Sequence, residues 1–368
     1  MNVTIYNGPD KEFTQIIPNS NISDFMDLII KSDKEKRSHE IIIKGQEVSC
    51  DEAETEVIEN LIVHSNDYSS VAEHVIENFI GFLKQFKINN LFIQNPPMQI
   101  YNKLLRFYPN TKIKNYKYKN LNINNLKNLN NNFSERIVGQ ESVKEYLLSA
   151  LYPLSKKNNN KPVVIMFYGS SGVGKTETAK YIAEILKGKI LRKQFSMFQN
   201  NEFSTYLFGG KYSERSFTKD LLERESNVIL LDEFDKCNSL FHSAFYELFD
   251  EGIMEDKNYR VDVRNSIIIC TSNYKSLEDI RTSLGDPIYS RFDSFIRFNN
   301  LDVNSICKII DREYRNQLVN LSKEELQIIK DNSIEEKLIF HAASLKNVRE
   351  IKNIIKEVIY LSIIREIL

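Results

Sequence analysis

Residues 167–176, FYGSSGVGKT, are the stretch that most constrains the fold. Gly169 is followed, after four residues, by the triplet 174–176, which is the GxxxxGK[ST] spacing of a phosphate-binding loop. An apolar run at 163–167 precedes the loop and apolar residues at helical spacing follow it, so the sequence predicts a strand, a glycine-rich loop and a helix. Glycines let backbone N–H groups surround a phosphate chain, and the helix N-terminus adds partial positive charge.

This phosphate-binding loop indicates a nucleotide bound with Mg²⁺. Lys175 is expected to reach the β- and γ-phosphates, and the hydroxyl of Thr176 is expected to ligate the metal. The residues predicted to contact the nucleotide here are Gly169, Ser170, Ser171, Gly172, Val173, Gly174, Lys175, Thr176 and Glu177.

Two later apolar runs end in polar side chains. The segment 227–235, NVILLDEFD, is typical of a buried strand that ends in Asp232 and Glu233. Asp232 is predicted to hold Mg²⁺ through water, and Glu233 to orient and deprotonate the attacking water. A strand at 267–270 leads to Asn273, whose neutral amide can bond the γ-phosphate or that water without adding charge.

Arg291 precedes a further predicted strand at 295–298. Taken alone it is a surface arginine. Taken with the nucleotide motifs, it is an arginine that could enter a neighbouring subunit's site and neutralise charge in the transition state.

Composition gives no evidence of a strongly charged partner. The 368 residues include 49 Lys and Arg against 50 Asp and Glu, for a net charge of −1. The cysteines are scattered without metal-binding spacing and are expected to be buried thiols in a reducing compartment: Cys50, Cys237, Cys270 and Cys307. With no apolar run of about 18 residues and no leader pattern, a cytoplasmic protein is expected.

The pattern predicts four regions. In residues 1–118, segments with the spacing of strands alternate with segments with the spacing of helices, which favours a small α/β domain. The predicted strands are at 3–6, 41–43, 91–93 and 111–116, and the predicted helices follow Ser23 and lie at 51–64, 70–86 and 99–107. Residues 119–133 are Asn-rich and are interpreted as a linker. An ATPase core at 134–300 and a helical lid at 301–368 follow.

The N-terminal region is divided by charge along its sequence. Nine carboxylates and no Lys or Arg lie between Lys44 and Lys84, whereas nine cations and no carboxylate lie in 79–134. One interpretation is that the halves pair across a solvated surface. The other is an adaptor surface for an acidic partner or nucleic-acid backbone, formed by Lys112, Lys114, Lys117 and Lys119 interleaved with Tyr116 and Tyr118.

Five segments together resemble AAA+ ATPases of the Clp/heat-shock unfoldase group, most closely the second ATPase module of the two-module members. In chain order they are IVGQESV, GSSGVGKTETAK, VILLDEFDK, VDVRNSIIICTSN and PIYSRFD, and the resemblance covers residues 134–365. It implies a P-loop core with a small helical lid, ATP and Mg²⁺ as cofactors, a ring that is usually hexameric, and an active site completed between subunits.

The resemblance also implies a role for each matching position. Ile137 and Val138 would flank the adenine, Asn273 would be the first sensor and Arg291 the arginine finger. Arg349, in the segment KNVREI, would be the second sensor, although Asn347 and Val348 stand where the family has small residues; the alternative is a solvated helix arginine.

The segment 207–217, LFGGKYSERSF, departs from the family. It is shorter than the loop with which threading unfoldases grip substrate, and Tyr212 is its one candidate for the gripping aromatic. The alternative is a packed or surface tyrosine. The tripeptide 80–82, Ile-Gly-Phe, resembles a peptidase-docking loop of some Clp ATPases, but it lies in a helical pattern and is interpreted as core.

The sequence therefore favours an AAA+ ATPase that couples ATP hydrolysis in a ring to remodelling or unfolding of a protein partner chosen by the N-terminal domain. The alternative is an ATP-dependent switch or assembly factor that loads or regulates a nucleic-acid-acting effector. A nucleotide-binding scaffold without turnover is disfavoured because Glu233, Asn273 and Arg291 are all present.

Overall fold

The computed structural model describes residues 1–40, 57–156, 159–197, 200–342, 345 and 347–368. The chain forms two compact units, and each draws on separate parts of the sequence. Unit 1 contains Met1–Tyr118, Phe198–Glu225 and Ile253–Val263. Unit 2 contains Lys119–Met197, Ser226–Gly252 and Arg264–Leu368.

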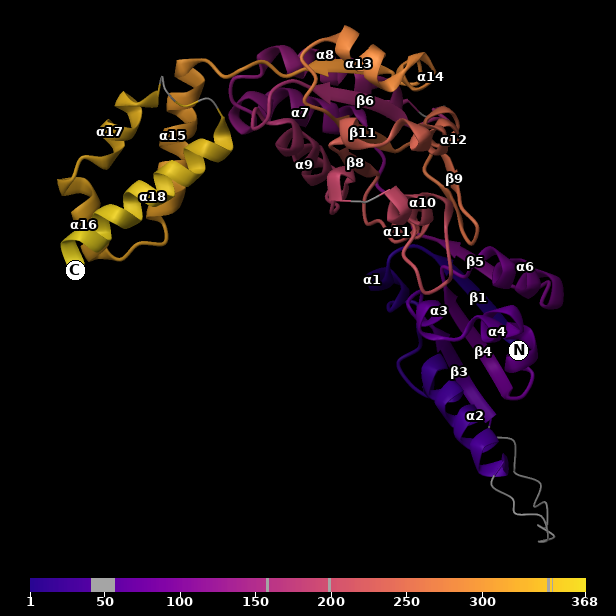
Figure 1. The fold of residues 1–368 in the computed structure, drawn as a ribbon. Helices are drawn as coiled ribbons and strands as arrows, with labels where there is room; N and C mark the ends of the chain where they lie inside the picture. Colours follow the sequence, from indigo (N-terminus) through magenta and orange to yellow (C-terminus); the bar gives the residue numbers. More distant parts are fainter. Residues whose placement is uncertain (41–56, 157–158, 198–199, 343–344, 346) are drawn as a thin grey trace. The chain divides into compact units, whose positions relative to one another are not determined.

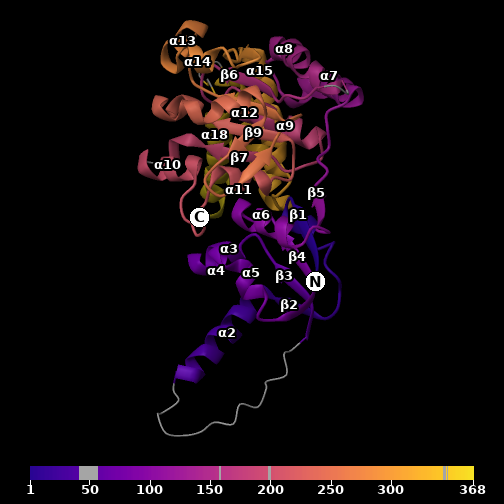
Figure 2. The ribbon, with the colours of Figure 1, turned by 90° about the vertical axis from the view of Figure 1, so that its right-hand side faces the viewer.

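Unit 1 is built on a five-stranded parallel sheet in the order β2-β3-β4-β1-β5. The strands are β1 (Asn2–Asn7), β2 (Ile22–Asp24), β3 (Val57–Val63), β4 (Lys87–Gln94) and β5 (Lys112–Asn115). Ile5 lies opposite Ile93 in the register of β1 and β4, and both side chains are fully buried. The helices are α1 (Asp10–Phe13), α2 (Phe25–Glu40), α3 (Asp67–Ser70), α4 (Glu73–Glu77), α5 (Phe79–Leu83) and α6 (Met98–Phe107), shown in Figures 1 and 2.

Two predictions for this region are corrected. The helix predicted at 51–64 is the strand β3 over its described part, because the run from Val57 to Val63 is rich in β-branched residues and is paired on both sides. The helix predicted at 70–86 is divided into short helices, because Ala72 and Asn78 have non-helical backbone angles. Ile80 and Phe82 in α5 are buried, as expected for core residues.

Some expectations fall outside the described residues. They include the strand at 41–43, residue Cys50 and the carboxylates at 47, 51, 52, 54 and 56. Of the remaining cysteines, Cys237 and Cys270 are buried free thiols and Cys307 is partly buried. In the part of the chain that the structure describes, no helix is long and apolar enough to cross a membrane.

Unit 1 also contains two segments from the middle of the chain. The first forms α10 (Asn200–Phe208) and α11 (Phe217–Leu222), and the second is the antiparallel hairpin of β9 (Ile253–Glu255) and β10 (Arg260–Asp262). Both segments lie within the range 134–300 that the sequence predicts as ATPase core.

Unit 2 contains a second five-stranded parallel sheet, in the order β12-β6-β11-β8-β7. The strands are β6 (Val163–Tyr168), β7 (Leu191–Gln194), β8 (Val228–Asp232), β11 (Ile267–Thr271) and β12 (Ser294–Arg297). Every residue of β6, β8 and β11 is buried, as expected for strands covered on both faces. The predicted P-loop core with a parallel sheet is confirmed.

One set of helices belongs to the core with this sheet, and a second set forms the lid. The core helices are α7 (Ile123–Arg136), α8 (Glu141–Leu151), α9 (Lys175–Ile185), α12 (Tyr246–Asp250), α13 (Leu277–Leu284) and α14 (Asp286–Tyr289). The lid consists of α15 (Val303–Leu318), α16 (Lys323–Asp331), α17 (Ile334–Phe340) and α18 (Val348–Ile367), drawn in yellow in Figure 1. Ile310 of α15 and Ile351 and Ile355 of α18 are buried in one lid core.

The Asn-rich segment 119–133, which the sequence predicts as a linker, lies in unit 2. Most of it forms α7, whose N-cap Asn122 exchanges side-chain and backbone hydrogen bonds with Asn125. Leu126, Leu129 and Phe133 are spaced for one helix face and are buried in the core with α8 and α9. The asparagines occupy the exposed faces, so their number hides the amphipathic pattern.

We expect Phe133→Ala to lower the free energy of unfolding of unit 2 by about 3–5 kcal/mol, because the fully buried ring leaves a cavity. Denaturant unfolding followed by tyrosine fluorescence measures the loss. Asn131→Ala on the exposed face of the same helix is the matched control and should change stability by less than about 0.5 kcal/mol. Equal effects of the two substitutions would show that α7 is not part of the core.

Candidate active site

The P-loop connects the carboxyl end of β6 to the first turn of α9. Gly169, Gly172 and Gly174 have φ values of 131°, 76° and 110°, a region that other residues rarely adopt. A Cβ on Gly169 would lie 2.3 Å from the carbonyl oxygen of Phe298, so backbone packing alone excludes a side chain there. The loop thus needs its glycines for shape as well as for access to a ligand.

A cavity of about 540 Å³ opens beside this loop. Its size is typical of small-molecule and cofactor sites. The predicted site residues that line it are Ile137, Val138, Ser171, Gly172, Val173, Gly174, Lys175, Thr176, Glu177, Asp232, Glu233, Asn273 and Arg349. Gly169 and Ser170 lie at the base of the loop and Arg291 lies elsewhere in unit 2, so these three do not line the cavity.

Lys175 is buried at the centre of the loop. Its Nζ donates hydrogen bonds to the carbonyl oxygens of Gly169 at 2.6 Å and Ser170 at 2.7 Å, and to Oδ1 of Asn273 at 3.2 Å. Burial lowers the pKa of Lys175 to about 8, and the nearby Arg349 acts in the same direction, against Asp232 and Asp235. A bound phosphate chain would give this ammonium group a negatively charged partner in place of neutral acceptors.

Asp232 is the last residue of β8 and Glu233 follows it, next to the end of β11. The hydroxyl of Thr271 donates to Oδ1 of Asp232 and accepts from the backbone N–H of Glu233 at 3.0 Å. Glu233 has a φ of 56°, an uncommon conformation for a residue with a side chain. The fully buried Phe234 packs against Phe195 and fixes the chain directly after it.

Sequence reasoning missed two residues of β7 that contact these carboxylates. Nε of Arg192 donates to Oδ2 of Asp232 at 2.8 Å, and Nε2 of Gln194 donates to Oε2 of Glu233 at 3.0 Å. The register of β7 and β8, which pairs Gln194 with Asp232, produces both contacts. The residues LRKQ carry no local motif, so only the strand order could have revealed them.

The oxygen donors at this edge fit Mg²⁺. In the described part of the chain no group of three or more His, Cys, Asp and Glu side chains could enclose a metal ion. Mg²⁺ is commonly bound by one or two protein oxygens together with substrate phosphates and water. Thr176 and Asp232, which both line the cavity, are a donor set of this kind.

The lid supplies the opposite wall of the cavity. The backbone N–H of Val348 donates to the carbonyl oxygen of Gly172 at 3.0 Å, and a Cβ on Gly172 would lie 2.8 Å from Cβ of Asn347. Asn347 also caps α18 by accepting from the N–H of Glu350 at 2.9 Å. The two residues that differ from the family pattern therefore join the lid to the P-loop, and Arg349 follows them at the start of α18.

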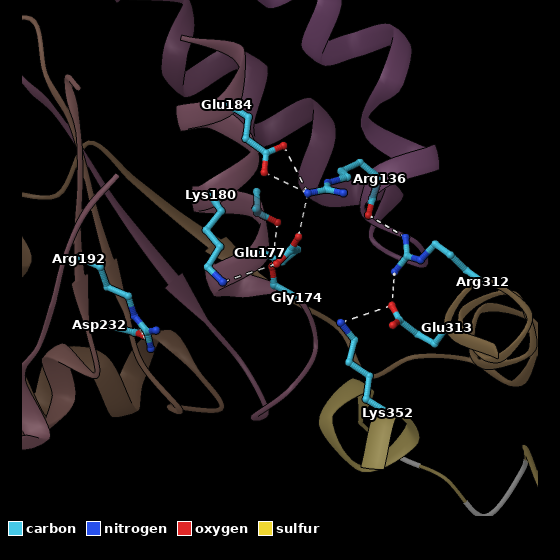
Figure 3. Close-up of polar contacts among 11 residues, drawn as sticks. Arg136, Gly174, Glu177, Lys180, Glu184, Arg192, Asp232, Arg312, Glu313 and Lys352 are labelled. Carbon is cyan, nitrogen blue, oxygen red and sulfur yellow. Dashed lines mark hydrogen bonds and ion pairs between the residues drawn. The ribbon is translucent and has the colours of Figure 1, made fainter. Parts of the chain in front are cut away.

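A second network links the lid to α7, as Figure 3 shows. Glu313 of α15 is buried and lies 3.4 Å from Nζ of Lys352 of α18 and 3.7 Å from Nη2 of Arg312. Nη1 of Arg312 donates to the carbonyl oxygen of Arg136 at 3.2 Å.

The cavity lining contains seven Lys or Arg and four Asp or Glu, a surplus of three positive charges (7 − 4) that suits a polyanionic ligand.

Arg291 lies between α14 and β12. Its Nε donates to Oδ2 of Asp250 at 2.8 Å, and its guanidinium stacks at 4.0 Å over the ring of Tyr246. The side chain is thus held outside the cavity of its own chain. The role expected for it in a neighbouring subunit stays a prediction.

The parallel sheet, the P-loop and the acidic strand end define a P-loop nucleotide-binding module. Residues 160–327 match the family described as AAA domain (Cdc48 subfamily). The chain is 34% identical over 173 residues to the AAA+ ATPase ClpV1 of Pseudomonas aeruginosa, which covers 44% of this chain and 19% of that protein. It is 27% identical over 235 residues to the chaperone protein ClpB of Malacoplasma penetrans, and this match covers 57% of this chain and 33% of that protein.

This segment is therefore a Clp-type AAA+ ATPase module. The chain spans a third or less of the length of these two relatives. Among solved structures, the Saccharomyces cerevisiae Hsp104–ADP complex is similar over 56% of this chain and 43% of the Hsp104 chain, with 22% sequence identity and a TM-score of 0.46.

The pKa of Lys175 predicts how nucleotide affinity depends on pH. Because the pKa is lowered to about 8 in the free protein, Lys175 loses its proton above that pH, whereas bound phosphates would raise the pKa again. ATP affinity should be nearly constant below pH 8 and fall as the pH rises toward 9.5, with proton uptake on binding. Titration calorimetry in buffers of different ionisation enthalpy measures both. Lys175→Met is the control and should bind weakly without this dependence; equal pH profiles for the two proteins would contradict the assignment.

Proposed function

We propose that the chain binds ATP with Mg²⁺ in this cavity, hydrolyses it within a ring of identical subunits, and uses the energy to remodel a protein partner. The observation that carries the proposal is the convergence of Lys175, Thr176, Asp232, Glu233 and Asn273 on one cavity that Arg349 of the lid also lines. These side chains come from separate segments of the chain, and a binding loop alone would not require them to meet.

Each side chain then has one task. Lys175 binds the β- and γ-phosphates, and Thr176 and Asp232 hold the metal, which neutralises charge on the phosphates when bound. Glu233 accepts a proton from the attacking water, while Asn273 orients that water or the γ-phosphate by hydrogen bonding. Ile137 and Val138 contact the base, and Arg349 relates lid position to the presence of the γ-phosphate.

Ring assembly is supported by the place of Arg291. It lies outside its own cavity and is held by an ion pair with Asp250, which is 46% exposed. A neighbouring cavity is the site where this guanidinium would stabilise transferred charge. The partner is proposed to be a protein because the similar proteins include the chaperone protein ClpB.

An exposed basic edge supports the second candidate function, a switch that acts on a nucleic-acid-associated effector. All four residues of the edge strand β5 are exposed, including Lys112 and Lys114, and Lys117 and Lys119 follow. Stimulation of ATP turnover by DNA or RNA, lost on replacing these four lysines with alanine, is the result that would favour it.

Glu233→Gln is expected to lower ATP turnover by about 10²–10⁴-fold, because the amide cannot accept the proton of the attacking water. Nucleotide binding should remain, since Gln194 can still hydrogen-bond the side chain. Phosphate release and equilibrium binding measure the two properties. Lys175→Ala, which should lose binding, is the control, and unchanged turnover in Glu233→Gln would remove Glu233 from its role.

Arg291→Ala is expected to lower turnover by about 10³-fold or more while ATP binding is kept, because the guanidinium stabilises charge only during transfer. Arg297→Ala, at an exposed arginine of the adjacent strand, is the matched control. The decisive measurement mixes Arg291→Ala and Glu233→Gln subunits, since a site built from two subunits recovers some activity in the mixture. No recovery together with normal turnover of Arg291→Ala alone would exclude the shared site.

A further inference from the structure

The loop 207–217 is part of unit 1, together with the N-terminal sheet. The hydroxyl of Tyr212 donates to Oε1 of Gln99 in α6 at 3.0 Å. Its ring packs against the hydrophobic core formed by β1, β3, β4 and α6. Tyr212 is thus half-buried in a defined position, which is the second of the two alternatives that the sequence left open.

The β9–β10 hairpin is joined to α6 and to the loop 207–217 by hydrogen bonds to backbone carbonyl oxygens. The N–H of Met98, in the first turn of α6, donates to the carbonyl oxygen of Asn258 at 2.8 Å. Nδ2 of Asn258 donates to the carbonyl oxygen of Gly210 at 3.0 Å. The N–H of Lys257 donates to the carbonyl oxygen of Phe208 at 3.0 Å. These bonds connect three segments that are far apart in sequence.

Two buried cations extend the same interface. Nζ of Lys219 donates to the carbonyl oxygen of Ser65 at 3.0 Å, and the hydroxyl of Ser65 donates to Glu223 at 2.6 Å. The Lys219 side chain is 9% exposed, and burial lowers its pKa.

Arg224, which is 4% exposed, forms the second of these contacts. Its guanidinium stacks at 3.9 Å on the ring of Tyr118 and donates to the carbonyl oxygen of Asp262 at 3.1 Å. Buried charges with fixed partners are costly to leave unpaired, and therefore they favour one lasting arrangement. The contacts of Lys219 and Arg224 are typical of a permanent interface rather than a transient one.

The interface covers the carboxyl end of the N-terminal sheet. Ser65 follows β3, Met98 and Gln99 follow β4, and Tyr118 follows β5. Open α/β sheets commonly bind ligands at this end. Here Asn95 bonds both the N–H and the carbonyl oxygen of Gly8, at 2.8 and 2.9 Å.

We propose that the loop 207–217, the adjoining residues Lys219 and Arg224, and the hairpin 253–263 form a mounting surface that holds residues 1–118 permanently, and that the loop does not grip a threaded polypeptide. The mounted segments lead directly into β8 and β11, whose carboxyl ends carry Asp232, Glu233 and Asn273. Nucleotide-dependent movement of those strands then reaches a protein partner through the N-terminal domain. This last step rests on the proposed function, whereas the mounting itself does not.

The test is photo-cross-linking of the full chain with benzoylphenylalanine in place of Tyr212, in the Glu233→Gln background. Unfolded casein is the probe for a gripped polypeptide, and ATP binding is measured on the same sample. We expect a cross-link to the 98–107 peptide whose yield changes less than twofold between no nucleotide, ADP and ATP, and no ATP-dependent cross-link to casein. Benzoylphenylalanine in place of Tyr146, an exposed tyrosine of α8, is the control and should give neither product.

An ATP-dependent loss of more than half of the internal cross-link, with casein captured in its place, would overturn the proposal. So would absence of the internal cross-link in every state. Hydrogen exchange of the chain with native Tyr212 gives a second readout, because the Met98 amide should stay protected in all nucleotide states. Loss of that protection with ATP would also overturn the mounting, whereas failure to bind ATP would count against the proposed function alone.

Discussion

The position of β11 between β6 and β8 is the constraint on which the ATPase site depends. Because the three strands are parallel, their carboxyl ends bring the P-loop, Asp232 and Asn273 to one edge of the sheet. Thr271, at the end of β11, then bonds both Asp232 and the backbone of Glu233. A change in strand order would separate groups that are proposed to act on the same phosphate.

The contact between lid and P-loop joins the site directly to the start of α18. Val348 and Asn347 touch Gly172 directly, while the network of Arg312, Glu313 and Lys352 joins α15 to α18. Under the proposed function, a nucleotide that altered the P-loop would act on the start of α18 without an intermediate element. Val348 makes its contact through its backbone N–H, which a small residue could also donate, whereas the cap of α18 depends on the side chain of Asn347.

The sequence predicted those parts of the molecule that are encoded by residues close together in the chain. The P-loop, the acidic end of β8 and the lid helices each follow from a short motif or a period, and the structure brings their residues to one cavity. Arg192 and Gln194 could not be predicted, because their contacts depend on the pairing of β7 with β8. Membership of Tyr212 in unit 1 likewise depends on contacts with Gln99, more than a hundred residues away. In α7 the many asparagines mask the helical spacing of Leu126, Leu129 and Phe133, so the sequence predicts a linker there.

A cryo-electron microscopy structure of the Glu233→Gln protein with ATP and Mg²⁺ would test the shared active site directly. We predict a closed ring in which ATP contacts Lys175 and Thr176, Arg291 of one subunit approaches the γ-phosphate bound by the next, and Tyr212 still contacts Gln99. A monomer with ATP bound, or a ring in which Arg291 stays on Asp250 in every subunit, would contradict the shared active site. A ring with Tyr212 facing a central channel would contradict the mounted N-terminal domain.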